Sequence, residues 1–236
     1  MSISIKRMRA IFVKDYKEFS RNYAISIILI FPILFAFLFR SAGPSLPGAI
    51  GFLLNTSFVI LTSLAQACLI AEEKERNTLR SLMMTPATTM DVLIGKSALV
   101  FVMSAVVLAV STYILGYEPA SMWAFVAAVI LSIILYIAAG TICGLFSKTV
   151  LEASLSIMPV ALVFTGAPWG VLLADHFPIF KMLEYAPSVQ LVHLLEIRST
   201  VFTMGDLLKS LLIILVWAVV LTVVSVVLYQ RRLKDE

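Results

Sequence analysis

The sequence predicts an all-α polytopic membrane protein that crosses the bilayer six times. Of its 236 residues, 61% are hydrophobic and only 14% are charged, and the mean hydropathy is +1.01. A soluble globular domain is about half apolar and about a quarter charged. The charged residues are clustered, and six uncharged runs of at least 18 residues separate the clusters, at 22–39, 41–71, 97–117, 119–147, 153–174 and 210–230. A helix needs about 20 such residues to cross ~30 Å of hydrocarbon, and an open sheet cannot satisfy its backbone in lipid.

Lysine and arginine residues predict the orientation of these spans. With six spans, both termini and the second and fourth loops lie on one side, and this side holds 14 of the 18 Lys and Arg residues. The others are Arg40, Lys181, Arg198 and Lys209. Because positive charges are enriched in cytoplasmic segments, we expect both termini in the cytoplasm. The net charge of +4 is explained by these residues facing anionic lipid headgroups, and requires no nucleic acid.

The first predicted element is an interfacial helix in residues 1–21. Its apolar residues recur at steps of three or four with Lys and Arg between them: Ile5, Met8, Phe12, Tyr16 and Phe19. This pattern is typical of an amphipathic helix that lies in the headgroup plane. We expect an elbow before the first span, serving as a contact for a cytoplasmic partner or as a simple anchor. The apolar run that follows is long for a secretory signal peptide and lacks a clean cleavage site, which predicts an uncleaved span.

The spans are predicted at 22–39, 49–71, 97–115, 120–146, 153–174 and 208–230. In the second span, Asn55 and Gln66 are expected to hydrogen-bond across helices, with contact to a cargo in a cavity as the alternative. In the fourth span, the small-residue pattern of Gly140 and Gly144 predicts a close helix–helix contact. The turn at 147–152 is short, which predicts antiparallel packing of the fourth and fifth spans.

A densely charged segment, residues 72–90, separates the second and third spans. Residues 72–84 are expected to form a short separate helix with Leu79, Leu82 and Met83 on one face. Thr85-Pro86 would end it, because the residue before proline avoids the helical region. Asp91 would begin the next helix as a cap-like residue. A solvated turn that only joins two spans is the alternative.

The run AEEKERNTLRSLMMTPATTMDVLIGK, residues 71–96, resembles the cytoplasmic loop of ABC-2 type permeases, the membrane subunits of type-2 ATP-binding-cassette (ABC) exporters. In that family the loop reads approximately AEEKERGTLE-LL-TP and is followed by a GK pair before the third span. The matching positions are Ala71 to Arg76, Thr78, Leu79, Leu82, Thr85, Pro86, Gly95 and Lys96. The usual glycine of the family is Asn77 here, and asparagine also tolerates a left-handed backbone.

The resemblance implies that residues 72–90 form a coupling helix, which docks on a separate cassette ATPase subunit. The residues expected to make this contact are Glu72, Glu73, Lys74, Glu75, Arg76, Asn77, Thr78, Leu79, Leu82, Thr85 and Pro86. Their charges would fix the register by complementarity with the partner. Two ATPase copies and a second permease chain, as a homodimer, are expected in the inner membrane of a prokaryote. ATP and Mg would be bound by the ATPase alone.

No nucleotide site is expected in this chain. Gly95-Lys96-Ser97 matches the end of a phosphate-binding loop, but the pattern requires a glycine five residues before Gly95, where Met90 stands. We therefore expect Lys96 to be an anchor at the level of the lipid headgroups. No catalytic, cofactor-binding or metal-binding residue is predicted.

The segment at 175–206 is expected to form short outer helices that re-enter the membrane surface. Pro178 and Pro187 lie in it, and Pro168 interrupts the fifth span; these three are the candidate outer gate, with a static lid as the alternative. His176, His193, Glu196 and Asp206 lie in or beside the segment, but they match neither HExxH nor GxSxG. Cys68 and Cys143 lie in different spans, where a disulfide is not expected.

The spans carry no Asp, Glu, Lys or Arg in their interiors, which argues against a proton- or sodium-coupled carrier. Their Phe, Met, Leu and Ile content favours a hydrophobic or amphipathic cargo, such as a membrane-active or antimicrobial peptide or a lipophilic drug. The predicted function is the translocation pathway of an ATP-driven exporter. The alternatives are a nucleotide-independent carrier or channel and, less favoured, an intramembrane enzyme that uses His193 or Asp175.

Overall fold

The computed structural model describes residues 4–21, 23–41, 48–76, 88–196 and 204–235, and its regular elements within these ranges are all helical. Five helical segments are long and apolar enough to cross a membrane: Ala49–Glu75, Met90–Leu115, Met122–Phe146, Val150–Val171 and Met204–Arg232. A further helix, α2 (Tyr23–Ser41), corresponds to the predicted first span and contains Pro32. Its apolar part within the described residues, Ile27–Ser41, is shorter than the other five. The structure is therefore that of an all-α polytopic membrane protein.

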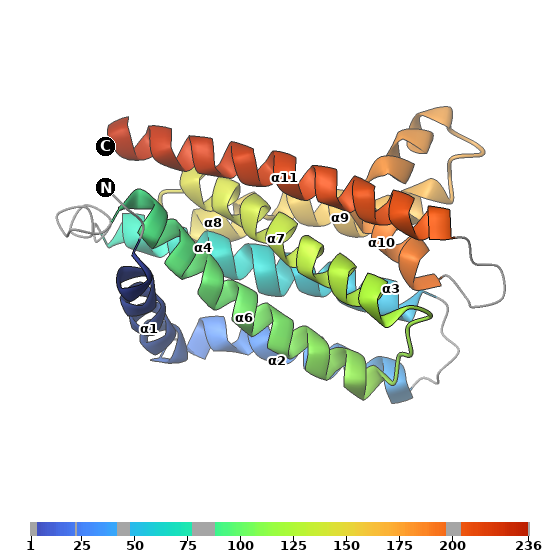
Figure 1. The fold of residues 1–236 in the computed structure, drawn as a ribbon, viewed down its shortest axis with the longest axis horizontal. Coiled ribbons are helices and arrows are strands. Elements are labelled where there is room, and N and C mark those ends of the chain that lie inside the picture. Colours follow the sequence, from blue (N-terminus) through green and yellow to red (C-terminus); the bar gives the residue numbers. More distant parts are fainter. Residues whose placement is uncertain (1–3, 22, 42–47, 77–87, 197–203, 236) are drawn as a thin grey trace.

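The long helices run side by side along the longest dimension of the molecule, and both ends of the chain lie at the same end of this bundle (Figure 1). There, α1 (Ile5–Arg21) lies across the bundle and packs against α6 (Thr89–Leu115) and α2. The buried face of α1 consists of Ile11, Asp15 and Phe19. This face is rotated from the predicted stripe, because Ile5 and Tyr16 are exposed.

The predicted second span is one continuous helical segment in the middle of the bundle. It consists of α3 (Ala49–Ser57), a π-helical stretch (η1, Phe58–Ser63) and α4 (Leu64–Glu75). The segment continues past Ala71 to Glu75. The prediction that a separate helix begins at Glu72 is therefore wrong. The π-helical stretch was not predicted, because wider backbone turns of this kind depend on tertiary contacts. One such contact is Ser63 Oγ, which donates to the carbonyl of Tyr136 at 2.7 Å.

Helix α6 begins eight residues before the predicted third span because of a cap at Thr88. The Thr88 side chain accepts a hydrogen bond from Asp91 N at 3.1 Å, and Asp91 Oδ2 accepts one from Thr88 N at 3.0 Å. This reciprocal pair is a capping box, which satisfies two free donors at a helix start. The helix therefore starts at Thr89, and Asp91 is its third residue rather than its cap.

Helix α7 (Met122–Phe146) packs closely on the second-span segment through the two predicted glycines. A Cβ atom at Gly140 would lie 2.3 Å from the carbonyl oxygen of Ser63, and one at Gly144 would lie 2.7 Å from that of Ala67. The pair therefore forms a packing face within this chain. The next predicted span is divided at Ile157 into α8 (Val150–Ser156) and α9 (Met158–Val171). The first of these packs on both α4 and α7.

Two short helices follow α9: a 3₁₀ helix, η2 (Pro178–Tyr185), and α10 (Pro187–Glu196). Helix α10 packs against α9 and α11. The last helix, α11 (Met204–Asp235), extends along α7 and returns the chain to the end where it began (Figure 1). The short helices η2 and α10, between α9 and α11, agree with the predicted short helices of residues 175–206. Their re-entry into the membrane surface stays a prediction.

Candidate functional site

The predicted polar contact Asn55 faces a cavity at the far end of the bundle from the chain termini. This cavity, named here the Asn55 cavity, has a volume of about 380 Å³ and lies between α3, α9 and α10. Asn55 is 2% exposed, and its Nδ2 donates to the carbonyl of Ser188 at 3.3 Å. Its Oδ1 has no hydrogen-bond partner among the described residues. The Asn55 cavity therefore contains a buried acceptor that a bound molecule could satisfy.

The other walls of the Asn55 cavity combine apolar and polar side chains. They include Phe52, Thr165, Trp169, His193 and Glu196. A site of this kind fits an amphipathic molecule, because an apolar body can pack on the rings while its donors reach Asn55 or Glu196. In the part of the chain that the structure describes, no group of three His, Cys, Asp or Glu side chains could hold a metal ion.

The three candidate gate prolines lie around this region in different roles. Pro168 is inside α9 and lines the Asn55 cavity, Pro178 begins η2, and Pro187 is the buried first residue of α10. Trp217 Nε1 and the Ser210 hydroxyl attach α11 to this region, donating to the Tyr185 carbonyl and to Gln190 Oε1, both at 2.9 Å. Of the three prolines, Pro168 alone therefore lines the Asn55 cavity.

Gln66, the other predicted polar contact, is fully buried and joins three helices. Its Nε2 donates to Thr141 Oγ1 at 3.1 Å and to Ser97 Oγ at 3.4 Å, which links α4 to α7 and α6. Gln66 does not line the Asn55 cavity, so its position corresponds to the cross-helix packing role that the sequence favoured.

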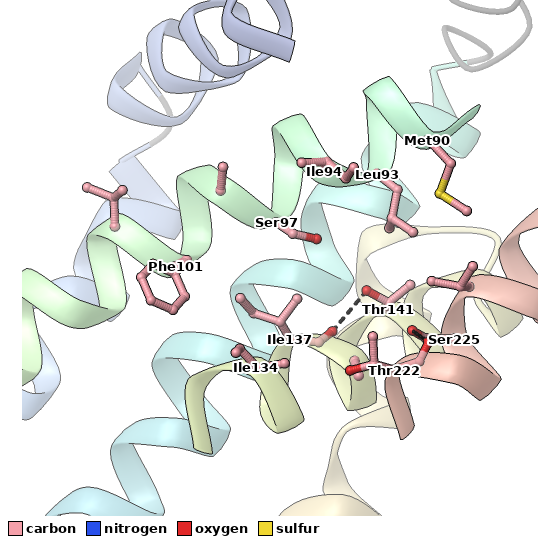
Figure 2. A pocket seen from close by; sticks show the side chains of 14 residues that line it. Met90, Leu93, Ile94, Ser97, Phe101, Ile134, Ile137, Thr141, Thr222 and Ser225 are labelled. Carbon is pink, nitrogen blue, oxygen red and sulfur yellow. Dashed lines mark hydrogen bonds between the residues drawn. The ribbon is translucent and has the colours of Figure 1, made fainter. Parts of the chain in front are cut away.

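The two partners of Gln66 line a second and larger cavity, named here the Thr222 cavity. It has a volume of about 470 Å³ between α6, α7 and α11. Figure 2 shows side chains from all three helices around it, with the hydroxyls of Ser97, Thr141, Thr222 and Ser225 among apolar groups. The sequence analysis did not predict this cavity, because its lining comes from three different spans, α6, α7 and α11, that only packing brings together.

Residues 72–76, the described start of the predicted coupling segment, are held by contacts within the chain. Arg76 pairs with Glu72 at 2.7 Å. Lys74 Nζ donates to the carbonyl of Leu145 at 2.8 Å, near the end of α7. Glu75 Oε2 accepts from the backbone N–H of Val150 at 2.8 Å, at the start of α8. The remaining predicted contacts lie outside the described residues: Asn77, Thr78, Leu79, Leu82, Thr85 and Pro86.

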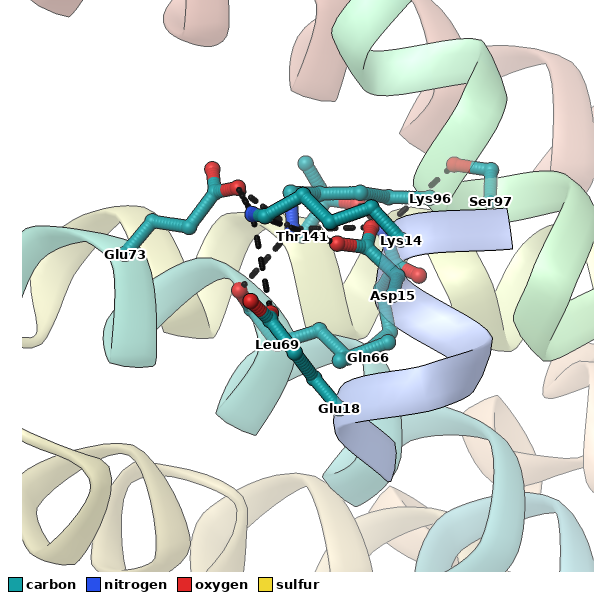
Figure 3. A network of polar contacts seen from close by, with 9 residues as sticks. All are labelled: Lys14, Asp15, Glu18, Gln66, Leu69, Glu73, Lys96, Ser97 and Thr141. Carbon is teal, nitrogen blue, oxygen red and sulfur yellow. Dashed lines mark hydrogen bonds and ion pairs between the residues drawn. The ribbon is translucent and has the colours of Figure 1, made fainter. Parts of the chain in front are cut away.

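Glu73 belongs to a buried network of charges, named here the junction, which consists of Lys14, Asp15, Glu73 and Lys96 (Figure 3). Lys96 Nζ lies 2.9 Å from Glu73 Oε1 and 3.1 Å from Asp15 Oδ2. Lys14 Nζ lies 3.3 Å from Glu73 Oε1 and 3.6 Å from Asp15 Oδ1. The junction joins α1, α4 and α6 with two positive and two negative charges.

Burial makes this pairing obligatory, because an isolated ion in a protein interior loses its hydration without compensation. Lys96 and Asp15 are each 1% exposed, and Glu73 is 4% exposed. Lys14 lies at the edge of the network. Partial burial opposes its positive charge, but the carboxylates of Glu73, Asp15 and Glu18 outweigh this and raise the pKa of Lys14 above its ordinary value.

A comparison with known families decides the identity of the chain. Residues 53–232, well over half of its length, match the family described as "ABC-2 family transporter protein". The chain belongs to the ABC-2 transporter family. The resemblance of its charged loop to ABC-2 permeases is thereby confirmed, and the chain is a permease of this family. No curated protein matches it.

In this ABC-2 permease, the GK pair before the third span supports the docking of α1. A Cβ atom at Gly95 would lie 3.0 Å from Ile11 Cγ2 and 3.1 Å from the carbonyl oxygen of Met8, so α1 lies directly on α6 there. The next residue, Lys96, is buried under α1 in the junction. The prediction that Lys96 anchors at the headgroups is therefore wrong. A lysine at this depth is stable only because two carboxylates from other elements reach it.

Asp15 and Lys14 were not identified as site residues from the sequence of the permease. A signal was present, because Ile11, Asp15 and Phe19 recur every four residues and place one carboxylate on an otherwise apolar helix face. An acidic residue on a buried face requires a cationic partner. The sequence could not show that the partner is Lys96, which is 81 residues away.

Proposed function

We propose that this permease is the membrane subunit of an ATP-driven exporter, with α2 as a sixth span and with both termini in the cytoplasm. The family membership supports an ABC transport function, and the excess of Lys and Arg at the end with the termini supports the orientation. ATP and Mg are bound by two copies of a separate cassette ATPase. A second copy of the permease completes the pathway, because the cavities of one chain are small.

The observation that carries this proposal is the continuous helical segment Ala49–Glu75, 27 residues long. One end holds the charged residues 72–76, and Asn55 lies near the other end. Twenty residues separate Asn55 from Glu75, which corresponds to about 30 Å of helix. A displacement of the charged end by an ATPase would therefore be transmitted along one continuous helical segment to the Asn55 cavity.

The structure changes which residues we propose for direct contact with the ATPase. Glu75 and Arg76 are exposed, and they lead directly into residues 77–87. Glu73 and Lys74 instead hold the segment to α1, α6 and α7. We therefore assign recognition of the partner to Glu75, Arg76 and the loop, and assign transmission into the permease to Glu73 and Lys74.

The proposed cargo is a hydrophobic or amphipathic compound, such as a lipophilic drug or a membrane-active peptide, that passes through the Asn55 cavity. The support is the combination of ring and aliphatic walls with a free acceptor on Asn55. Pro168, Pro178 and Pro187 would serve as hinge positions of the surrounding elements during release.

The test is assembly of this permease with its proposed cassette ATPase. Arg76→Glu should reduce co-elution of the two proteins in detergent by about tenfold or more and abolish ATP-dependent transport in vesicles, because like charges at a binding surface suppress association. Lys181→Glu is the matched control, since it makes the same charge change on an exposed residue at the opposite end of the bundle.

Unchanged assembly and transport in Arg76→Glu would refute the assigned coupling role. Transport by the isolated permease, without ATPase or ATP, would instead establish a nucleotide-independent carrier.

A further inference from the structure

We propose that the Asn55 cavity selects an organic cation, a small lipophilic compound with a protonated amine or a quaternary ammonium group. This inference rests on the proposed function, because it takes the cavity as the site through which the cargo passes. It adds the charge of the cargo, which the apolar composition of the spans does not specify. The observation that carries it is one carboxylate, Glu196, combined with the rings of Phe52 and Trp169 in a cavity whose lining contains no lysine or arginine.

The charge of the cavity lining is negative. Glu196 of α10 lines the cavity and forms no ion pair with any residue that the structure describes. The other ionisable side chain of the lining is His193. Arg40, Lys181 and Lys209, the described lysines and arginine of this end of the bundle, do not line the cavity. Apolar walls screen a charge less than water does, so a cleft with one sign of charge concentrates ligands of the opposite sign. The cavity therefore favours a cation over an anion.

Aromatic rings line the cavity from two other helices, Phe52 from α3 and Trp169 from α9. The face of an aromatic ring attracts a cation that lies within about 6 Å of its centre, and proteins recognise quaternary ammonium groups in this way. The Phe52 ring is held in position by Phe35 and Phe39 of α2, with ring centroids 6.2 and 5.9 Å away. Trp169 is 60% exposed, so its ring is not covered by other parts of the described chain. The three helices around the cavity thus each contribute a group that attracts a cation.

The size of the cavity restricts the cation to a small molecule. Its volume of about 380 Å³ lies in the lower part of the range of roughly 300–1,000 Å³ that is typical of small-molecule sites. A compact amine with an aromatic or aliphatic body fits this space, and Val189 and Val192 provide apolar walls for that body. A peptide would place little more than one side chain in it. We therefore assign the site to a small amphipathic cation.

The test measures binding of tritiated tetraphenylphosphonium, a rigid lipophilic cation, to the full-length permease in an uncharged detergent by equilibrium dialysis. Tetraphenylborate is the matched probe, because it has the same shape and a negative charge. We expect saturable binding of the phosphonium. Glu196→Gln should weaken this binding about fivefold, the effect of one partly exposed charge pair. Glu196→Lys should weaken it further and should increase the binding of tetraphenylborate. The measurement is made at pH 8, where imidazole side chains are ordinarily neutral.

Matched variants outside the cavity are the controls. Glu118→Gln and Glu118→Lys make the same charge changes on an exposed carboxylate at the same end of the bundle, and they should leave the binding of both probes unchanged. Trp169→Leu should weaken phosphonium binding about threefold, the effect of one cation–π contact. Trp123→Leu changes another exposed tryptophan, outside the cavity, and should have no effect. Thermal unfolding of each variant reports whether it folds.

Three results would overturn the proposal. The first is the absence of saturable phosphonium binding to the wild-type permease. The second is phosphonium binding that the folded Glu196→Gln and Glu118→Gln variants change equally, or tetraphenylborate binding that Glu196→Lys does not increase. The third is binding of a lysine-rich peptide that depends on Glu196 and is not displaced by the phosphonium, which would identify a peptide as the ligand.

This measurement separates the selectivity of the cavity from the coupling to ATP. No ATPase or ATP is present, so failure of the binding test would leave the proposed exporter function unaffected. Failure of the Arg76→Glu assembly test would in turn leave the binding result unchanged, because Arg76 does not line the cavity.

Discussion

Two carboxylates from different helices hold Lys96 in its buried position. Asp15 reaches it from α1 and Glu73 from α4, and a further bond of 3.4 Å runs from its Nζ to the carbonyl of Leu69. These charges pair with one another inside the protein, whereas the charges of a surface loop face solvent. Within residues 72–76, the charged side chains contact one another or neighbouring elements, and Glu75 and Arg76 are also exposed.

Removal of one junction charge should destabilise the permease strongly. Lys96→Met leaves Asp15 and Glu73 buried without their main cation, and breaking a buried pair in this way costs about 3–5 kcal/mol. We expect a large fall in the Tm of the detergent-purified protein, measured by fluorescence-detected unfolding. Lys148→Met, an exposed lysine at the same end, is the control.

The double variant Asp15→Asn/Lys96→Met should lose less stability than the sum of the two single variants, because the two residues are in contact. Additive losses, or a Tm of Lys96→Met equal to that of Lys148→Met, would contradict the structural role of the junction.

At the scale of elements, the close contact of α7 with the second-span segment depends on glycine. A methyl group at Gly140 would meet the carbonyl of Ser63, part of the π-helical stretch, and one at Gly144 would meet that of Ala67. Neither carbonyl can move without disturbing a buried helix. The capping box at Thr88 acts at the same scale, because it extends α6 far enough for Asp91 to pair with Arg7 of α1 at 3.2 Å.

Gly140→Ala should therefore separate α7 from α4 and destabilise the fold by about 1–3 kcal/mol, the usual cost of overpacking a close contact. Gly166→Ala is the matched control on α9, since no atom lies within 4 Å of a Cβ there and alanine favours helix more than glycine does. The measurement is the Tm of each variant in detergent. A Gly140→Ala variant as stable as Gly166→Ala would show that α7 can shift without cost.

At the scale of the whole molecule, the bundle has two ends with different roles. One end carries both described chain termini, α1, the junction and the charged segment, while the other carries α10, η2 and the Asn55 cavity (Figure 1). The segment Ala49–Glu75 connects the two ends through the centre. This polarity agrees with the proposed exporter, in which an ATPase acts at one membrane face and cargo is released at the other.

The orientation of this polarity can be measured with single cysteines. In a background where Cys68 and Cys143, both free, are replaced by Ser, we expect Lys181→Cys to react with a membrane-impermeant maleimide in intact cells. Lys148→Cys should react only after the membrane is opened. Both lysines are exposed, so burial does not explain a difference. The reverse pattern of labelling would invert the proposed topology and place the charged segment outside the cell.

The sequence by itself determined the membrane class, the approximate location of each long helix, the charged segment and the family. These follow from run length, charge clustering and residue order, which are local properties of the chain. Only the tertiary structure decided that Lys96 and Glu73 are buried, that α1 turns Asp15 inward, that the second span contains a π-helical stretch, and that α6, α7 and α11 together line a cavity. The physical reason is that each of these depends on a partner far along the chain, 81 residues away for Lys96 and Asp15 and 59 for Lys14 and Glu73, and hydrophobic patterning carries no information about such pairs.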